Sequence, residues 1–425
     1  MNARKSIPTI ETPLVASNAF RKTVLPNGLT IVSEFLPNTF SAALGFWIKS
    51  GSRNEPPAIN GISHLIEHMA FKGTSKRSAF DIASEIENVG GVLNAYTSKE
   101  LTCYYAYTLH EHLLLAADVL TDILTNQVFS PLELAKEKDV IFEEIRSVLE
   151  APEERIHDYF HLHLFENHPF SYPIMGSEAT LRSIDRAALV EFFQQNYTLD
   201  RLVIAAAGCV DHNELCDYFS EKFEHWSPKA DAPSFQEPSR PRQKQETYVE
   251  DIQQGHFCVG TVALSFSDPL RYAAYVLNTI VGGCMSSRLF QTLREEHALC
   301  YNVYSDFELF DDAGIFFVYG ATDSGKLDLA TDLVFEEFEK LKADSITEEE
   351  LYRTKTQLRG GLLLGLEGAS NRMNWHAKRE IYNETFIPPE ESIRQIEKLT
   401  IEDIERVASL VFDPKHMVVT RLKAK

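Results

Sequence analysis

The sequence predicts an α+β fold of two homologous domains, each a mainly antiparallel sheet with helices packed on one face. Three observations lead to this prediction. A chain of 425 residues is too long for one ordinary hydrophobic core. Strand and helix patterns alternate along the chain, and the pattern of its first half returns in its second half. The composition, 44% apolar and 24% charged, is that of a soluble globular protein.

The first half begins with a hairpin. Strands are expected over 20–25 and 29–32, and Pro26-Asn27-Gly28 between them is a strong turn signal. A third strand is expected over 42–48, just ahead of a short helix that contains two histidines. The elements expected next are a helix over 78–89, strands over 92–96 and 101–109, and helices over 111–126 and 131–149.

A linker is expected over 226–245, where Pro, Ser and charged residues replace any apolar periodicity. It separates an N-terminal domain over 1–225 from a C-terminal domain over 246–425. We expect the second domain to be the structural homologue of the first.

Two segments of the first half have counterparts in the second. The helix, capped turn and charged helix over 122–140 return over 338–355, and the segment 61–108 is paralleled by 282–321. The sequence therefore predicts duplication of one α+β unit, of which only the first copy carries the histidine pair.

Charge and cysteine usage limit the classes of partner and the compartment. A net charge of −21 argues against nucleic acid, whose phosphates require a basic surface, and fits a basic or neutral partner better. Six scattered cysteines without a C-x-x-C pair indicate a reduced, intracellular protein. No apolar run is long enough for a membrane span, and the first residues lack a secretory signal. A cytoplasmic location is expected, with an organellar matrix as the alternative.

The segment His64-Leu65-Ile66-Glu67-His68 has the spacing of a metal site. On a helix, His64 and His68 project from the same face one turn apart, so that both imidazoles reach one ion. Glu67 is placed to reach a metal-bound water rather than the metal, as a general base does. This H-x-x-E-H order is a known zinc-peptidase motif, although a five-residue match also arises by chance on an exposed helix.

A catalytic zinc usually takes a third protein ligand and leaves one position for water. Glu144, on the predicted helix over 131–149, is the leading candidate. Glu137 lies two turns earlier on the same helix face and could hydrogen-bond a ligating histidine. Spacing alone does not distinguish either glutamate from a solvated helix face.

The segments over 64–74 (HLIEHMAFKGT) and 94–98 (NAYTS) resemble the pitrilysin family of zinc peptidases, in particular its mitochondrial processing peptidases and their bacterial relatives. The resemblance covers nearly the whole chain. It implies that Glu144 is the third zinc ligand and that Glu137 supports the site.

The same resemblance implies roles in substrate binding. The strand containing Asn94, Ala95 and Tyr96 would pair with the substrate backbone by strand addition, and Phe71 would line the pocket beside the scissile bond. Glu154 and Asp158 match acidic positions that receive a basic substrate side chain, with an exposed helix face as the alternative reading.

In the second half, Arg294 and Tyr301 resemble the family's arginine–tyrosine element, which binds substrate carbonyls and stabilises the oxyanion. Because this chain carries both this element and the zinc motif, a self-sufficient homodimer or monomer is favoured over half of an obligate heterodimer.

The sequence therefore predicts a zinc endopeptidase with one Zn²⁺ per chain that cleaves unfolded peptides or precursor segments, with a basic residue near the cut. The domain over 1–225 would be its zinc-binding catalytic domain, and the domain over 246–425 would carry the arginine–tyrosine element. The expected assembly is a homodimer without a membrane span or a nucleic-acid partner. The alternative is a non-catalytic peptide-binding or scaffold subunit of the same family.

Overall fold

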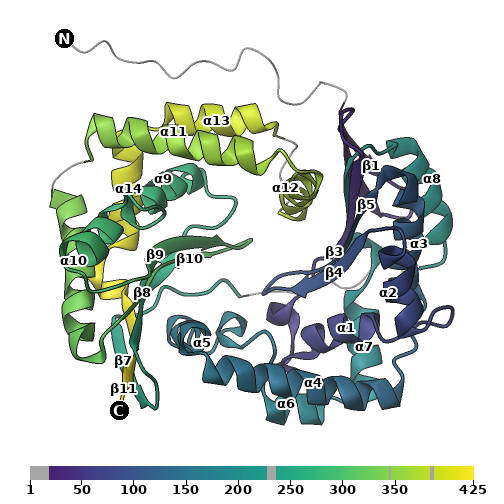
Figure 1. Cartoon of the computed structure of the whole chain (residues 1–425), viewed down its shortest axis with the longest axis horizontal. Coiled ribbons are helices and arrows are strands. Elements are labelled where there is room, and N and C mark those ends of the chain that lie inside the picture. Colours follow the sequence, from purple (N-terminus) through teal and green to yellow (C-terminus); the bar gives the residue numbers. More distant parts are fainter. Residues whose placement is uncertain (1–18, 227–235, 344–345, 383–386) are drawn as a thin grey trace.

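The computed structural model describes residues 19–226, 236–343, 346–382 and 387–425. Two sheets lie side by side, each flanked by helices (Figure 1). Residues 1–18 of the predicted first domain and 227–235 of the predicted linker lie outside the described residues, as does Ser345 of the predicted repeat.

The first sheet has six strands in the order β1-β2-β6-β3-β5-β4. All neighbouring pairs are antiparallel except β2 and β6, which are parallel. Since β4 has a strand partner on one side only, its outer edge is available for pairing. The strands are β1 (Phe20–Val24), β2 (Thr30–Phe35), β3 (Ser41–Ile48), β4 (Val92–Thr97), β5 (Thr102–Leu109) and β6 (Leu202–Gly208).

The second sheet has five strands in the order β7-β11-β8-β10-β9, again with one parallel pair, β7 and β11. This is the order of the first sheet without β1, so β9 is the counterpart of β4. The predicted fold of two homologous units with mainly antiparallel sheets is confirmed. The strands are β7 (Lys244–Glu250), β8 (Gly255–Ala263), β9 (Val303–Leu309), β10 (Gly314–Thr322) and β11 (Val418–Ala424). The first two residues of β7 thus fall within the predicted linker.

The helices follow the order expected from the sequence. In the first half they are α1 (Ile62–Ala70), α2 (Ala79–Glu87), α3 (Leu113–Thr125), α4 (Pro131–Glu150), α5 (Pro152–Leu164), α6 (Glu178–Ser183), α7 (Arg186–Asn196) and α8 (His212–Lys222). In the second half they are α9 (Arg271–Val281), the π-helical segment η6 (Phe290–Glu296), α10 (Leu327–Ala343), α11 (Glu348–Gly365), α12 (Ala369–Ile381), α13 (Pro389–Lys398) and α14 (Ile401–Val411). None of the helices in the described part of the chain combines the length and apolar character needed to cross a bilayer.

One face of each sheet packs on helices of its own half, as predicted. In the first half, Phe46 of β3, Leu65 and Ile66 of α1, and Leu120 of α3 belong to one buried cluster. Burying each such side chain contributes roughly 1.5–3 kcal/mol. This packing fixes α1 against the sheet, and therefore fixes the face of α1 that carries the histidines.

The opposite face of each sheet is covered by a helix from the other half, which the sequence did not predict. Helix α12 lies on the first sheet through a stripe at four-residue spacing: Ala369, Met373, Ala377 and Ile381. Trp47 of β3 packs on this stripe. Figure 1 shows α12 between the two halves.

Helix α5 makes the reciprocal contact with the second sheet. Ile156, Phe160 and Leu164, again four residues apart, pack on a cluster that includes Phe317 of β10 and Val418 of β11. Strands such as β3 are accordingly buried on both faces rather than on alternate residues.

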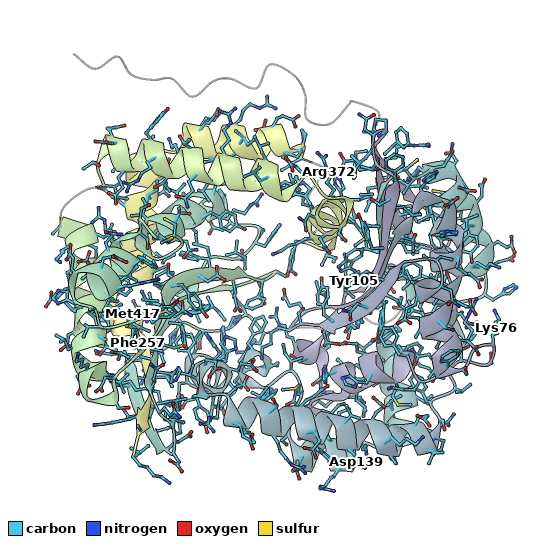
Figure 2. The ribbon with its side chains drawn as sticks, viewed as in Figure 1. Lys76, Tyr105, Asp139, Phe257, Arg372 and Met417 are labelled. Carbon is cyan, nitrogen blue, oxygen red and sulfur yellow. The ribbon has the colours of Figure 1, made fainter. Side chains whose placement is uncertain are left out.

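Buried ion pairs reinforce the exchange of helices. The carboxylate of Glu34 on β2 is 1% exposed and lies 2.5 Å from Nη1 of Arg372 and 2.8 Å from Nε2 of His376, both on α12. In Figure 2, Arg372 and Tyr105 lie where the halves meet, whereas Lys76 and Asp139 lie on the outer surface. The halves are therefore joined both by apolar packing and by buried ion pairs. Removing one partner of such a pair is strongly destabilising, because it leaves an uncompensated buried charge.

Candidate metal centre

Helix α1 presents its polar face to a gap beside β4 because its other face is buried. Ile62, Leu65, Ile66 and Met69 pack into the core, which leaves the histidines and Glu67 on the opposite side. The first turn has no capping side chain, since the residue before it is Gly61 with φ of 98°.

A remote carboxylate supplies this cap instead. Glu55 accepts hydrogen bonds from the backbone N–H groups of Gly61 (2.7 Å) and Ser63 (2.8 Å), and from the side-chain amide of Asn60 (2.7 Å). Burial raises the pKa of Glu55 to about 7, against the effect of these donors. The start of the histidine helix is thus anchored to the loop that precedes it.

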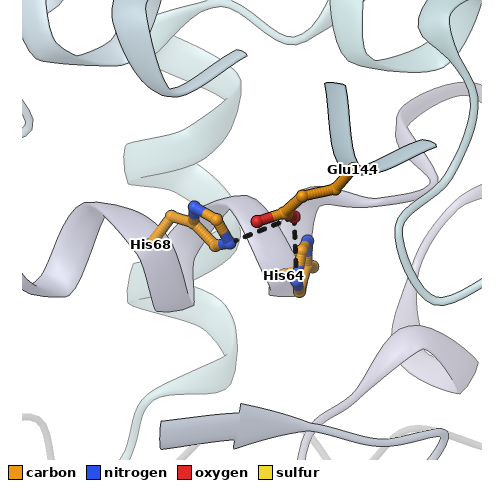
Figure 3. Close-up of side chains that lie close together, drawn as sticks. All are labelled: His64, His68 and Glu144. Atoms are coloured by element: carbon orange, nitrogen blue, oxygen red, sulfur yellow. Dashed lines mark ion pairs between the residues drawn. The ribbon is translucent and has the colours of Figure 1, made fainter. Parts of the chain in front are cut away.

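His64, His68 and Glu144 come together in the structure, as the sequence predicted. Their candidate ligand atoms all lie within 4.8 Å of one another. Oε2 of Glu144 on α4 lies 3.6 Å from Nε2 of His68 and 4.0 Å from Nε2 of His64 (Figure 3). Ligands at 2.0–2.1 Å from a tetrahedral zinc stand roughly 3.3 Å apart, so the two distances to Glu144 would each shorten by less than about 1 Å around a bound ion.

Glu137 lies behind this cluster. Its Oε2 is 3.2 Å from Nδ1 of His68, and its Oε1 is 2.9 Å from Nζ of Lys72. Glu137 is buried, and the ammonium of Lys72 is its ion-pair partner. As the acceptor for Nδ1–H, Glu137 leaves the lone pair of His68 on Nε2, the nitrogen on the side of Glu144.

His64 differs from His68 in its second nitrogen. Nδ1 of His64 is buried without a hydrogen-bond partner among the described residues. Burial, together with the neighbouring His68, lowers the pKa of His64 to about 4. His64 is therefore neutral at pH 7, which is the form that binds a metal ion.

Glu67 lies beside the cluster and is held by β4. The hydroxyl of Thr97 donates to its Oε2 at 2.5 Å, which leaves Oε1 available for another proton donor. Burial raises the pKa of Glu67, while Thr97 and His68 act in the opposite direction. A carboxylate with a raised pKa beside a cluster of metal ligands is suited to accepting and returning a proton.

A cavity of about 430 Å³ opens next to His64 and Glu67. Glu154 and Asp158 of α5 line it, as do Ala95 and Tyr96 of β4. These four residues, which the sequence placed in substrate binding, therefore surround one cavity. It is also lined by Thr97, Lys99, His157, His161 and Met175.

The other two predicted substrate residues, Asn94 and Phe71, are not among the residues that line this cavity. Asn94 is exposed on β4 and accepts a hydrogen bond from the N–H of Ala95. Phe71 ends α1 and packs half-buried on the core, with its ring 6.3 Å from that of Tyr104.

Within the described ranges, Arg294 and Tyr301 make no hydrogen bond, ion pair or ring contact with His64, His68 or Glu144 of their own chain. They contact each other instead: the guanidinium of Arg294 lies 4.9 Å from the ring centre of Tyr301 and 4.7 Å from that of Phe290. Tyr301 is 83% exposed. The pair thus presents a preassembled cationic and phenolic surface to the outside of the second half.

Sequence reasoning missed three residues around the site, Glu55, Lys72 and Lys99, and it missed the hydrogen bond that Thr97 donates to Glu67. Lys72 and Thr97 stand within the motif segments that carry the family resemblance, so their positions were available as a signal. Glu55 and Lys99 had no local signal, because their partners lie on other elements.

Comparison with known proteins places the fold and the motif in one family. Residues 30–178 match the model of insulinase (peptidase family M16), and residues 183–358 match that of the peptidase M16 inactive domain. An uncharacterized zinc protease of Bacillus subtilis is 39% identical over 91% of this chain and 94% of its own. The β subunit of the mitochondrial-processing peptidase of Saccharomyces cerevisiae is 33% identical over 95% of this chain and 90% of its own.

Solved structures agree in fold. A peptidase M16 inactive domain from Pseudomonas fluorescens superposes with a TM-score of 0.90 at 18% identity, covering 96% of this chain and 98% of that one. A protease from Helicobacter pylori gives 0.89 at 22% identity, covering 95% and 99%. The resemblance inferred from the motifs is confirmed, and the chain belongs to peptidase family M16, the insulinase family.

Proposed function

We propose that this protein is a zinc-dependent endopeptidase that cleaves unfolded peptides or precursor segments. The observation that carries the proposal is the convergence of His64, His68 and Glu144 within 4.8 Å, with Glu67 beside them. Two imidazoles and one carboxylate form a usual catalytic zinc set with one open position. The relatives named zinc proteases and the processing-peptidase β subunit support the same assignment.

The three ligands would hold one Zn²⁺ per chain, and Glu137 would orient His68 toward it. Bound zinc supplies a water of pKa near 7 and polarises the scissile carbonyl. Glu67 accepts the proton of the attacking water at Oε1, since Oε2 is held by Thr97. The same carboxyl then delivers this proton to the leaving amine, which a raised pKa favours.

The substrate would bind as an extended strand on the free edge of β4, at Asn94, Ala95 and Tyr96. Backbone pairing gives affinity with little dependence on sequence. One substrate side chain would enter the cavity lined by Glu154 and Asp158, with Phe71 close to the scissile bond. Such binding requires an unfolded segment, because a folded one has no free strand to add.

Arg294 and Tyr301 would act on the metal site of a second copy of the chain. Tyr301 is largely exposed although it is a large aromatic residue, and Arg294 stacks on its ring. A homodimer would then carry two composite sites, each with zinc ligands from one chain and an oxyanion-binding pair from the other. We also propose that the protein is located in the cytoplasm.

A metal-removal assay on a doubly blocked peptide tests the function. A fluorogenic peptide with acetylated and amidated ends excludes exopeptidase activity. We expect internal cleavage that is lost after dialysis against a chelator and restored by one equivalent of zinc per chain. Retention of full activity in the chelated protein would refute the proposal, and tight binding without cleavage would support the non-catalytic alternative.

A further inference from the structure

Lys99 is a cation built into the wall of the cavity beside Glu67. It stands in the turn between β4 and β5 and is 6% exposed. Its Nζ donates to the carbonyl of Tyr172 at 2.5 Å. Lys99 lines the cavity together with Glu154 and Asp158, the two carboxylates of α5.

Lys99 is not neutralised by a close ion pair. Among the described residues, no carboxylate lies within the 4.0 Å of an ion pair with its Nζ. Burial lowers the pKa of Lys99, and the nearby carboxylates of Asp158, then Glu308 and Glu55, act in the opposite direction and favour the charged form. The converse also holds: burial raises the pKa of Asp158, and the charge of Lys99 lowers it. A single carbonyl acceptor leaves the ammonium with further donors and with its field acting on the cavity.

The net negative charge of the cavity is therefore smaller than the two carboxylates of α5 alone would give. His157 and His161 also line it, and burial lowers both of their pKa values, so they are neutral at pH 7. Apart from Glu67, two negative charges face one positive charge. A guanidinium entering beside Asp158 gains attraction from that carboxylate and loses part of it to repulsion by Lys99.

We propose that Lys99 sets the charge preference of this cavity by offsetting Asp158, so that a basic side chain is favoured only modestly over a neutral one of the same shape. The inference rests on the proposed peptidase function, because it concerns which substrate residue the site accepts. Lys99 is thus a specificity-determining residue, and its removal sharpens the preference for arginine.

Paired peptides that differ only in arginine or citrulline test this directly, since citrulline is the neutral isostere of arginine. The residue is placed in turn at each position flanking the cut, and kcat/KM is measured for both peptides. We expect Lys99→Met to raise the arginine-to-citrulline ratio about tenfold, and Lys99→Arg to leave it within about twofold of wild type. Lys136→Met, at an exposed lysine paired with Glu133, is the matched control and should not change the ratio.

A second variant tests the same claim without altering Lys99. In Glu154→Gln/Asp158→Asn, Lys99 becomes the sole charged group, besides Glu67, among the described residues that line the cavity. We expect the preference to invert, with a peptide carrying glutamate cleaved faster than its glutamine counterpart. Melting temperature and zinc content confirm that each variant is folded and loaded.

The outcomes distinguish an error in the role of Lys99 from an error in the peptidase function. If wild type cleaves the peptides but neither Lys99→Met nor the double variant shifts the charge preference, the role of Lys99 is wrong and the peptidase function stands. If wild type cleaves no peptide while loaded with zinc, the proposed function itself fails.

Discussion

Oε2 of Glu137 lies 3.2 Å from Nδ1 of His68, while Oε1 of the same carboxylate lies 2.9 Å from Nζ of Lys72. One buried side chain thus connects a proposed zinc ligand to a cation that is itself partly exposed. Support of this kind fixes the tautomer and direction of a ligating histidine. Zinc affinity should therefore depend on residues that do not touch the metal.

Replacing Glu137 with glutamine should weaken zinc binding by about 10- to 100-fold, because an amide is a poorer acceptor for Nδ1–H. Lys72→Met should act in the same direction, and Lys72→Arg should restore most of the affinity. Competition with a fluorescent chelator measures the dissociation constant. Glu143→Gln, at an exposed glutamate of α4 paired with Arg146, is the control and should bind zinc as wild type does.

Glu55 should make stability depend on pH. Its pKa in the folded protein, about 7, lies above the ordinary value of 4.5. Between pH 4.5 and pH 7, Glu55 is therefore protonated in the folded state and ionised in the unfolded state. Stability should accordingly fall as pH rises from about 4.5 to 7 and level off above.

Glu55→Gln mimics the protonated carboxyl and removes this dependence. Urea unfolding at pH 5 and pH 8 should show wild type losing about 2.5 kcal/mol relative to the variant across this interval. Parallel pH curves for the two proteins would show that Glu55 titrates normally.

The exchanged helix α12 should couple the two halves in unfolding. Met373 is fully buried between α12 and the first sheet. It packs on Gly45 of β3 so closely that a methyl group at that position would lie 3.3 Å from the sulfur of Met373. Met373→Ala should cost about 2–5 kcal/mol and shift a single transition of the whole chain. Leu364→Ala, at a residue of α11 that is 70% exposed, should cost less than about 0.5 kcal/mol. Two separate transitions in wild type would contradict the coupling.

Mixing two inactive variants tests whether the site is completed by a second chain. Glu67→Gln and Arg294→Ala should each be strongly impaired alone. If Arg294 acts on the partner's metal site, a mixed dimer contains one intact site, and re-associated mixtures should recover about a quarter of wild-type activity. No recovery in mixtures shown to contain mixed dimers would place Arg294 in the site of its own chain.

Local patterns in the sequence account for much of the fold and for the centre of the site. The Pro26-Asn27-Gly28 turn and the four-residue spacing of His64 and His68 depend only on near neighbours, and the structure has the hairpin and helix expected there. Glu144 lies far along the chain, and the family resemblance rather than its spacing singled it out. The structure then brought it to the histidines.

What the sequence did not reveal depends on how remote elements meet. The apolar residues from Ala369 to Ile381 can be recognised in the sequence as one face of a helix. Their spacing does not indicate that this face packs on the sheet of the other half. Lys99 reads as an ordinary turn lysine until the fold buries it beside Asp158. Both cases require the topology, because their contacts join segments that are distant in the chain.

Zinc content and peptide cleavage, measured together for wild type and Glu67→Gln, test the central claim most directly. We expect one zinc per chain in both proteins, because Glu67 is not placed among the ligands, and a loss of at least about a hundredfold in kcat/KM for Glu67→Gln. A Glu67→Gln protein that binds zinc and cleaves as fast as wild type would contradict the account.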